Sequence, residues 1–174
     1  MDFLANKANK MKEGLKMHFH SPSKGPLTLE ETFFDVIRYI KEQPREQYKL
    51  IIGTDSHTHY DTNIIFVTAV IVHRVGKGGR YFFRREKQRF LESLRQRIFF
   101  ETSLSLDVAS QFSALLAENG HSQLNVEIHL DVGERGDTKE MIREVVGMVI
   151  GSGFDARIKP DSYGATKVAD KYTK

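Results

Sequence analysis

Three strand-like segments joined by short links constrain the fold of this chain more than any other feature. Residues 50–54 read LIIGT, residues 63–73 read NIIFVTAVIVH, and residues 80–86 read RYFFRRE after a GKGG turn. β-Branched and aromatic residues favour strands, and strands that follow one another through short links pair antiparallel. The sequence therefore predicts a three-stranded antiparallel meander.

The second half of the chain alternates between helical and strand patterns. A helical pattern covers residues 90–118, and residues 124–132 alternate between apolar and polar as a strand does. A helix capped by Asp137, a short strand at residues 155–159 and a final helix beginning in SYGATKVADKYTK follow. Strands separated by helices are expected to run parallel through right-handed crossovers. We therefore predict an α/β fold with a mixed five-stranded sheet, in which strands four and five run parallel to strand one, flanked by helices.

The N-terminal segment differs in character from the rest of the chain. Residues 1–27 carry five lysines and the loop HSPSKGP, so we expect a basic, loosely ordered arm. The spacing of Thr28 and Glu31 is that of a capping box, which predicts a helix that runs to about Glu42. Residues 28–174 are expected to form a single domain, with this helix added at its N-terminal end.

The composition narrows the class of protein. A chain of 174 residues with 40% hydrophobic residues is long enough for one globular domain with a core. It has no apolar stretch near the roughly 20 residues that cross a bilayer, and its charged N-terminus does not resemble a secretory signal, so we expect no membrane association and a cytoplasmic location. The absence of cysteine excludes disulfides and thiolate metal sites.

The charges are distributed unevenly along the chain. Residues 74–97 hold nine lysines and arginines against two acids, an excess of +7, whereas residues 101–155 hold ten acids against three basic residues, an excess of −7. A basic surface beside clustered acids suits an enzyme that acts on a polyanion through metal ions. The alternative is a solvated, salt-paired surface.

Asp55 stands where the first predicted strand ends, in LIIGTDSHTHYD. One interpretation is a turn, because aspartate bonds its own backbone two residues on. A second is a zinc-type site with His57 and His59, and a third is a carboxylate at a strand tip that binds a hard cation. The first strand alone does not choose among them.

Glu101 interrupts the apolar stripe of the long helix. The stripe is formed by residues in alternating steps of three and four, Leu91, Leu94, Ile98, Ser105, Val108, Phe112 and Leu115, and Glu101 falls among them. A buried, unpaired carboxylate is costly, so an inward Glu101 needs a cation, a hydrogen-bond network or a proton. The alternative is a rotated helix with Glu101 at the surface.

Two further acids follow predicted strands. Asp131 ends the fourth strand, so it would share a sheet edge with Asp55 if the two strands are adjacent and parallel. Their mutual repulsion would be relieved by a divalent cation between them. Asp161 follows the fifth strand in IKPDSYGA, near the start of the final helix. Taken singly, each of these acids is also compatible with a helix cap or a turn.

The order of elements resembles that of the ribonuclease H-like superfamily. The strings SKGPLTLEE, IIGTDSH, HLDVGERGDTKEMI and IKPDSYGATKVADKYTK more closely resemble the YkuK family of bacterial proteins. This resemblance implies two divalent ions, Mg²⁺ or Mn²⁺, bound by the four acids Asp55, Glu101, Asp131 and Asp161. Asp170, further along the last helix, is the alternative for the fourth acid. His57 is a possible auxiliary residue that orients a water or contacts a phosphate.

These observations lead to one functional prediction and one alternative. The prediction is a metal-dependent nuclease that acts on RNA or DNA, with phosphate contacts from the basic segment, namely Arg80, Arg84, Arg85, Lys87 and Arg89. The alternative is a catalytically inactive nucleic-acid-binding or scaffold domain with the same fold. A metal-dependent amidohydrolase built on the His57 and His59 pair is disfavoured, because the usual barrel does not fit in this length.

Overall fold

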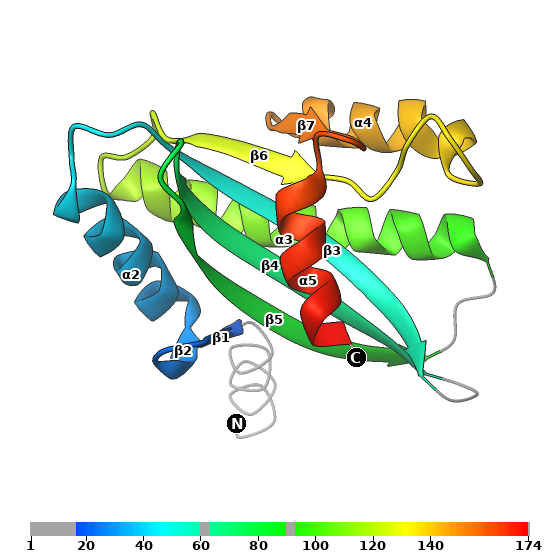
Figure 1. Ribbon diagram of the computed structural model, residues 1–174, viewed down its shortest axis with the longest axis horizontal. Helices are drawn as coiled ribbons and strands as arrows, with labels where there is room; N and C mark the ends of the chain where they lie inside the picture. Colours follow the sequence, from blue (N-terminus) through cyan, green and yellow to red (C-terminus); the bar gives the residue numbers. More distant parts are fainter. Residues whose placement is uncertain (1–16, 60–62, 90–92, 174) are drawn as a thin grey trace, which may run out of the picture.

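A seven-stranded mixed sheet forms the centre of the computed structural model, which describes residues 17–59, 63–89 and 93–173. The strand order is β2-β1-β5-β4-β3-β6-β7, and helices pack on both faces of the sheet (Figure 1). The α/β class and the mixed sheet predicted from the sequence are confirmed, although the sheet has seven strands and not five.

The predicted meander is the core of this sheet. Strands β3 (Tyr48–His59), β4 (Asn63–Arg74) and β5 (Gly79–Arg89) pair antiparallel in chain order. β4 lies between the other two strands and is almost entirely buried, as its β-branched sequence predicted. The turn from β4 to β5 places Gly76 and Gly78 at φ values of 76° and 91°, which residues with a side chain rarely adopt.

The two strands that follow the meander along the chain run parallel to β3. Helix α3 (Leu94–Glu118) leads to β6 (Asn125–His129), which pairs parallel with β3. The 3-10 turn η1 (Lys139–Met141) and helix α4 (Ile142–Gly151) lead to β7 (Asp155–Arg157), which pairs parallel with β6. Helix α5 (Tyr163–Thr173) ends the described chain. The parallel arrangement predicted for these two strands is confirmed.

The predicted Asp137 cap is wrong, because α4 is preceded by η1 and begins without a side-chain cap. The neighbouring Thr138 instead closes the loop that precedes the helix, since its hydroxyl accepts the N–H of Gly133 at 3.0 Å. This contact fixes the loop beyond β6, which borders the candidate site.

The two additional strands come from the segment predicted to be a loose arm. Residues 1–16 of that arm lie outside the described residues, but β1 (His18–Ser21) and β2 (Gly25–Thr28) form a hairpin that extends the sheet beside β5. The reason is burial: Phe19 is completely buried and packs edge-on against Phe112 of α3, with ring centroids 6.0 Å apart. Met17 is also buried in the core and His20 stacks on Phe83, so a few anchors order a segment whose composition is mostly polar.

Helix α2 (Leu29–Glu42) begins as predicted. The Thr28 hydroxyl accepts the N–H of Glu31, and the Glu31 carboxylate accepts the N–H of Thr28, both at 3.1 Å. The capping box is therefore confirmed.

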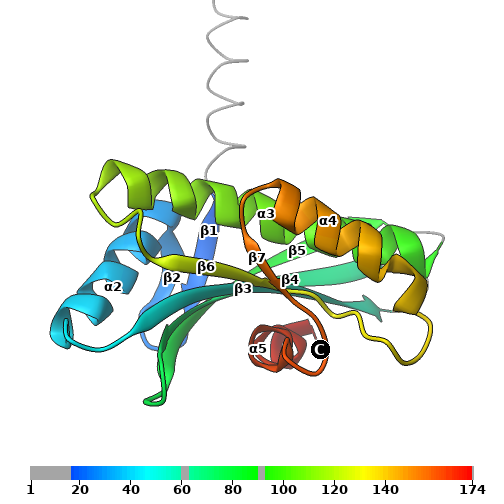
Figure 2. The ribbon, with the colours of Figure 1, turned by 90° about the horizontal axis from the view of Figure 1, so that it is seen from above.

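Alternate residues of the central strands serve two different layers. Helices α3 and α4 cover one face of the sheet and α5 covers the other (Figure 2). Leu50 and Ile52 join the large core under α2 and α3, whereas Ile65 and Val67 form a small cluster with Ala169 of α5. Because side chains alternate along a strand, consecutive residues of β3 point toward different helices. No helix in the described part of the chain is long and apolar enough to cross a membrane.

Candidate functional site

Asp55 and Asp131 stand at the same level of two neighbouring parallel strands. The last register pair of β3 and β6 joins Gly53 to His129, and each acid lies two residues beyond that pair. Their common placement at this end of β6 agrees with the prediction. The interpretation of Asp55 as a turn or strand-tip residue is wrong, because β3 continues to His59 and Asp55 pairs with Val67 of β4.

Glu101 approaches the site from α3. Its side chain is buried, with 7% of the residue exposed, so the prediction of an inward carboxylate is confirmed. The hydroxyl of Ser56, on the α3 side of β3, donates a short hydrogen bond to Oε1 of Glu101. The Arg97 guanidinium donates to the Ser56 hydroxyl at 3.0 Å and to its carbonyl oxygen at 3.1 Å. Glu101 is thus held by a polar relay that links α3 to β3.

Burial raises the pKa of Glu101 to about 8. The hydrogen bond from Ser56 opposes this change, the negative charges of Asp55 and Asp131 reinforce it, and the positive charge of Arg97 opposes it. A carboxyl group in this environment retains a proton at neutral pH unless a cation compensates its charge.

Asp55 has a second acidic neighbour, Asp170 of α5. Burial raises the pKa of Asp55 to about 6, against a backbone hydrogen bond at Ser56 that lowers it. The charges of Asp131 and Asp170 and a side-chain hydrogen bond with Asp170 raise it further. Two carboxyl groups can share a hydrogen bond only if one of them is protonated, and a cation between them could take the place of that proton.

The course of α5 explains why Asp170 and not Asp161 reaches Asp55. A Cβ built on Gly53 would stand 2.7 Å from Cβ of Ala165, and the Thr173 carbonyl oxygen lies 2.6 Å from Nε2 of His59. Helix α5 therefore follows β3 in the same direction and carries Asp170 toward Asp55. Asp161 is exposed in the turn before α5, and it is not among the charges that act on Asp55 or Glu101.

Asp131 is partly exposed and already has a cationic partner. Nζ of Lys159 lies 2.7 Å from its carboxylate. Asp131 also lines a small crevice with Glu101 and His129, between α3 and the end of β6. Sequence reasoning missed Lys159, Ser56 and Arg97. Only Ser56 had a local signal, as the neighbour of Asp55 on the opposite face of a strand.

A buried polar cluster lies beneath Asp131 and was also missed. Glu127 is 3% exposed and lies 3.3 Å from Lys49, 3.2 Å from His129 and 3.6 Å from Arg157. Burial alone would raise the pKa of Glu127, but the hydrogen bond with His129 and the charges of Lys49 and Arg157 lower it. Burial lowers the pKa of His129. The ion pairs tie the start of β3 and strand β7 to β6, which supports Asp131.

The two histidines of the opening motif lie beyond the acids. His57 is exposed, and its ring packs edge-on against His59, with centroids 5.2 Å apart. Strand alternation places His57 on the α5 face, the same face as Asp55. An auxiliary role for His57 remains a prediction.

The predicted phosphate contacts divide into two groups. Arg80 lies 2.9 Å from the buried carboxylate of Asp35, and Arg84 lies 2.6 Å from Glu86, so both have acidic partners. The other three, Arg85, Lys87 and Arg89, are exposed and alternate along one face of β5.

Arg85 belongs to the same row of the sheet as Asp55. Asp55 pairs with Val67 of β4, and Val67 pairs with Arg85 of β5. Two strand spacings of about 4.8 Å each separate their backbones, so Arg85 lies roughly 10 Å away on the Asp55 face. Helix α5 packs on Val67 between them, so a chain of phosphates could meet both residues only by passing around this helix.

Carboxylates are suitable ligands for a hard divalent cation, but the acids of this site are not arranged as a metal-binding group in the described residues. Within residues 17–59, 63–89 and 93–173, no group of three or more histidine, aspartate and glutamate side chains is arranged so that it could hold a metal ion. The Ser56 hydroxyl contacts Glu101, and Lys159 contacts Asp131. Carboxylate oxygens are the ligands that Mg²⁺ and Mn²⁺ prefer, and a cation would relieve the repulsion that raises the pKa of Asp55.

The order of the strands in the mixed sheet and the helices on both of its faces (Figure 2) are those of an α/β protein of the ribonuclease H-like class. A family model described as Ribonuclease H-like matches residues 31–174, and the chain belongs to this family. The uncharacterized protein YkuK of Bacillus subtilis (strain 168) is 34% identical over 167 residues, which span 90% of this chain and 96% of that protein. No solved structure gives a significant match.

Proposed function

We propose that this protein is a metal-dependent nuclease that cleaves phosphodiester bonds of RNA or DNA with the help of two Mg²⁺ or Mn²⁺ ions. The observation that carries the proposal is the electrostatic coupling of acids from four different elements. The charges of Asp131 beyond β6 and Asp170 of α5 raise the pKa of Asp55 on β3, and the charges of Asp55 and Asp131 raise the pKa of Glu101 on α3. Clustered acids without a cation cost stability, and function is the usual reason to retain them.

Asp55, Glu101, Asp131 and Asp170 would bind the ions, and Asp161 remains the alternative fourth ligand suggested by the sequence. When bound, the two metal ions would activate a water molecule and stabilise the leaving oxygen of the phosphodiester. The residues around the acids would prepare them for binding. Ser56 and Arg97 orient Glu101, and Lys159 holds Asp131 until a cation replaces it.

The exposed cations of β5 would hold the substrate. Arg80 and Arg84 form ion pairs with acids. Among the described residues no such pair is found for Arg85, Lys87 or Arg89, which lie on the face that carries Asp55. Phosphate contacts of this kind supply affinity without sequence preference. We therefore expect cleavage with little dependence on base sequence.

The direct test is cleavage in Mn²⁺ of RNA, DNA, RNA–DNA hybrid and branched substrates by the wild-type protein and by Asp55→Asn. Asparagine keeps the size of the side chain and removes the charge. We expect the wild type to cleave at least one substrate and the variant to lose most of that activity. Equal activity of the two proteins on every substrate would refute the nuclease.

The second candidate is a catalytically inactive nucleic-acid-binding or scaffold domain. It is favoured by the Lys159 pair on Asp131 and by the lack of a preassembled metal group among the described residues. This candidate predicts that the wild type binds nucleic acid but leaves every substrate intact, with or without Mn²⁺. The same panel therefore separates the two functions.

A further inference from the structure

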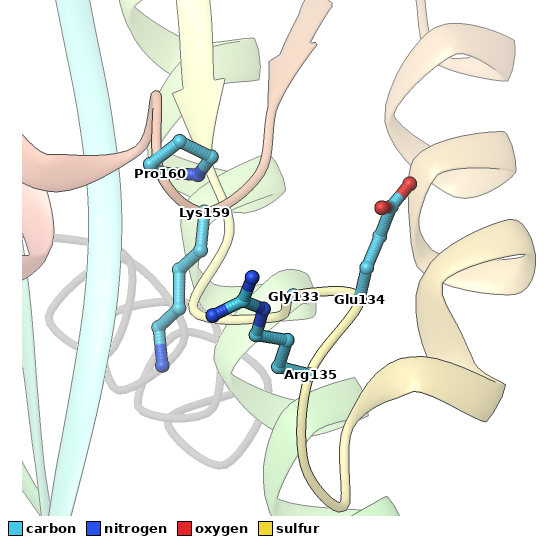
Figure 3. A pocket seen from close by; sticks show the side chains of 5 residues that line it. All are labelled: Gly133, Glu134, Arg135, Lys159 and Pro160. Atoms are coloured by element: carbon cyan, nitrogen blue, oxygen red, sulfur yellow. The ribbon is translucent and has the colours of Figure 1, made fainter.

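A cavity of about 500 Å³ opens near Asp131, because Lys159, the ion-pair partner of Asp131, is one of its lining residues. It is lined by Gly133, Glu134 and Arg135 of the loop after β6 and by Lys159 and Pro160 of the segment after β7. Figure 3 shows the side chains of Lys159 and Arg135 extending into the same space, while the Glu134 carboxylate is directed away from them. The cavity therefore presents two cations and no inward acid among its lining residues.

The two segments that form the cavity are fixed to one another. The N–H of Lys159 donates to the carbonyl oxygen of Val132 at 2.9 Å, and Thr138 closes the loop by accepting from Gly133. A Cβ built on Gly133 would stand 3.1 Å from Cβ of Lys159, so a glycine permits this close approach. These contacts fix the backbone of the two segments that carry Arg135 and Lys159.

The positive charge continues beyond this cavity. A second hollow, which shares Glu134 and Arg135 with the first, is lined by Lys139 and Arg143. No ion pair is found for Arg135, Lys139 or Arg143 within the described part of the chain. Lys159, in contrast, is neutralised by Asp131, so Arg135 is the first uncompensated cation beside the acids.

We propose that this cavity is a phosphate subsite, in which Arg135 and Lys159 bind a phosphate group of a nucleic-acid strand whose neighbouring nucleotide lies at the acids. A guanidinium binds phosphate through paired hydrogen bonds, and the volume exceeds what a lone phosphate needs. The stems of Arg135 and Lys159 and the ring of Pro160 offer an apolar surface to a sugar. This inference rests on the proposed action on nucleic acid and adds a second contact region to that of β5.

The two contact regions lie on either side of the acids. Arg85 stands across β4 from Asp55, and the cavity lies beyond Asp131 on the β6 and β7 side. A strand that meets both regions would pass around α5, which covers the sheet between Arg85 and Asp55. The phosphate in the cavity belongs either to the backbone of a continuous strand or to a strand end, and the experiment below distinguishes these sources.

The test measures equilibrium binding, so it does not depend on cleavage. Fluorescence anisotropy with single-stranded 12-mers is recorded for Arg135→Ala in the full-length Asp55→Asn background with Mg²⁺ present. The oligonucleotides carry a 5′-phosphate, a 3′-phosphate or neither. The matched control is Arg45→Ala, which removes an exposed arginine just before the start of β3, at the end of the strand away from Asp55.

We expect Arg135→Ala to weaken binding about tenfold and to reduce the salt dependence by about 0.7 in log–log slope, the contribution of one contact to a single strand. Equal weakening of the three oligonucleotides assigns the cavity to a backbone phosphodiester, and selective weakening of one phosphorylated end assigns it to a terminal phosphate. Binding by Arg135→Ala equal to that by Arg45→Ala overturns the subsite. A protein that never cleaves but shows the Arg135 effect refutes the nuclease and leaves the subsite standing.

Discussion

The carboxyl group of Asp55 on β3 shares a hydrogen bond with the carboxyl group of Asp170 on α5, across the small apolar cluster that joins the helix to the sheet. Two acids in such contact need either a proton or a cation between them. The pair connects the position of a whole helix to the charge state of the site. Both the pair and its neighbours can be tested by substitution.

The first concerns the identity of the fourth acid. We expect Asp170→Asn to reduce Mn²⁺-dependent cleavage at least about a hundredfold, because it removes a carboxylate next to Asp55 that we propose as a metal ligand. Asp161→Asn is the matched control on the same segment, and we expect it to stay near wild-type activity. Initial rates on the best substrate measure both. A large loss of activity in Asp161→Asn, with Asp170→Asn near the wild type, would favour Asp161 as the fourth ligand.

The second concerns the stability of the metal-free protein. The pKa of Glu101 is about 8 in the folded chain and 4.5 in a model peptide, so between these values the folded state holds a proton that the unfolded state has released. The free energy of unfolding should therefore fall as the pH rises from about 4.5 to about 8. We expect Glu101→Gln to flatten this fall and to be more stable than the wild type at pH 8.5 by roughly 1–3 kcal/mol.

Urea unfolding in EDTA at pH 5.5 and 8.5 measures this effect. Glu118→Gln, an exposed acid at the end of the same helix, serves as the control and should follow the wild-type profile. A Glu101→Gln variant with the same loss of stability on raising the pH would show that Glu101 does not hold the proton.

The third concerns metal binding without substrate. A cation that binds the folded chain alone raises its stability, by about 2.7 kcal/mol at a hundredfold excess over the Kd. We expect Mn²⁺ to raise the unfolding temperature at pH 8 and to do so less at pH 5.5, where protons compete for Asp55 and Glu101. The increase should vanish in Asp55→Asn. An equal increase in the variant would place the binding elsewhere.

The fourth concerns the contact of α5 with β3. Gly53→Ala would bring a Cβ to 2.7 Å from Ala165 and 3.1 Å from the His129 carbonyl oxygen, so α5 must move. We expect a loss of about 1–3 kcal/mol in unfolding free energy, together with lower activity because Asp170 moves with the helix. Gly147→Ala in α4 meets nothing within 4 Å and should be neutral or stabilising by up to about 1 kcal/mol. Urea unfolding of both variants checks the contrast.

Much of the fold could be predicted because its elements carry their own signals. The β-branched run of β4, the Thr28 capping box and the alternation before Asp131 are local patterns, and each predicted element is present. The hairpin of β1 and β2 could not be found in this way. Its order depends on Phe19 reaching Phe112, a contact that no local pattern records.

The site was predicted only as far as strand order and helix register allow. The stripe on α3 was sufficient to turn Glu101 inward, and parallel pairing was sufficient to bring Asp131 level with Asp55. The choice between Asp161 and Asp170 depends on the direction in which α5 crosses the sheet. That direction follows from the packing of Ala165 on Gly53. Lys159 was missed for a similar reason, since only the register of β6 and β7 brings it to Asp131.

The short strands at the two ends of the sheet bear on how this protein stays in solution. The most aggregation-prone segment of the chain is β4, whose run of β-branched and aromatic residues could template the growth of fibrils. It is enclosed by β3 and β5, while the outermost strands, β2 and β7, have only four and three residues, and β2 contains Pro26.

Strand β1 pairs with β5 at one register position, so among the described residues no further strand pairs with the outer edge of residues 84–89, and this edge is rich in arginine and lysine. Charged edges oppose strand-to-strand association. Arg85, Lys87 and Arg89, which we propose to contact the substrate, would therefore also oppose self-association of the protein. Replacing them with neutral residues should make the protein less soluble even where no nucleic acid is present.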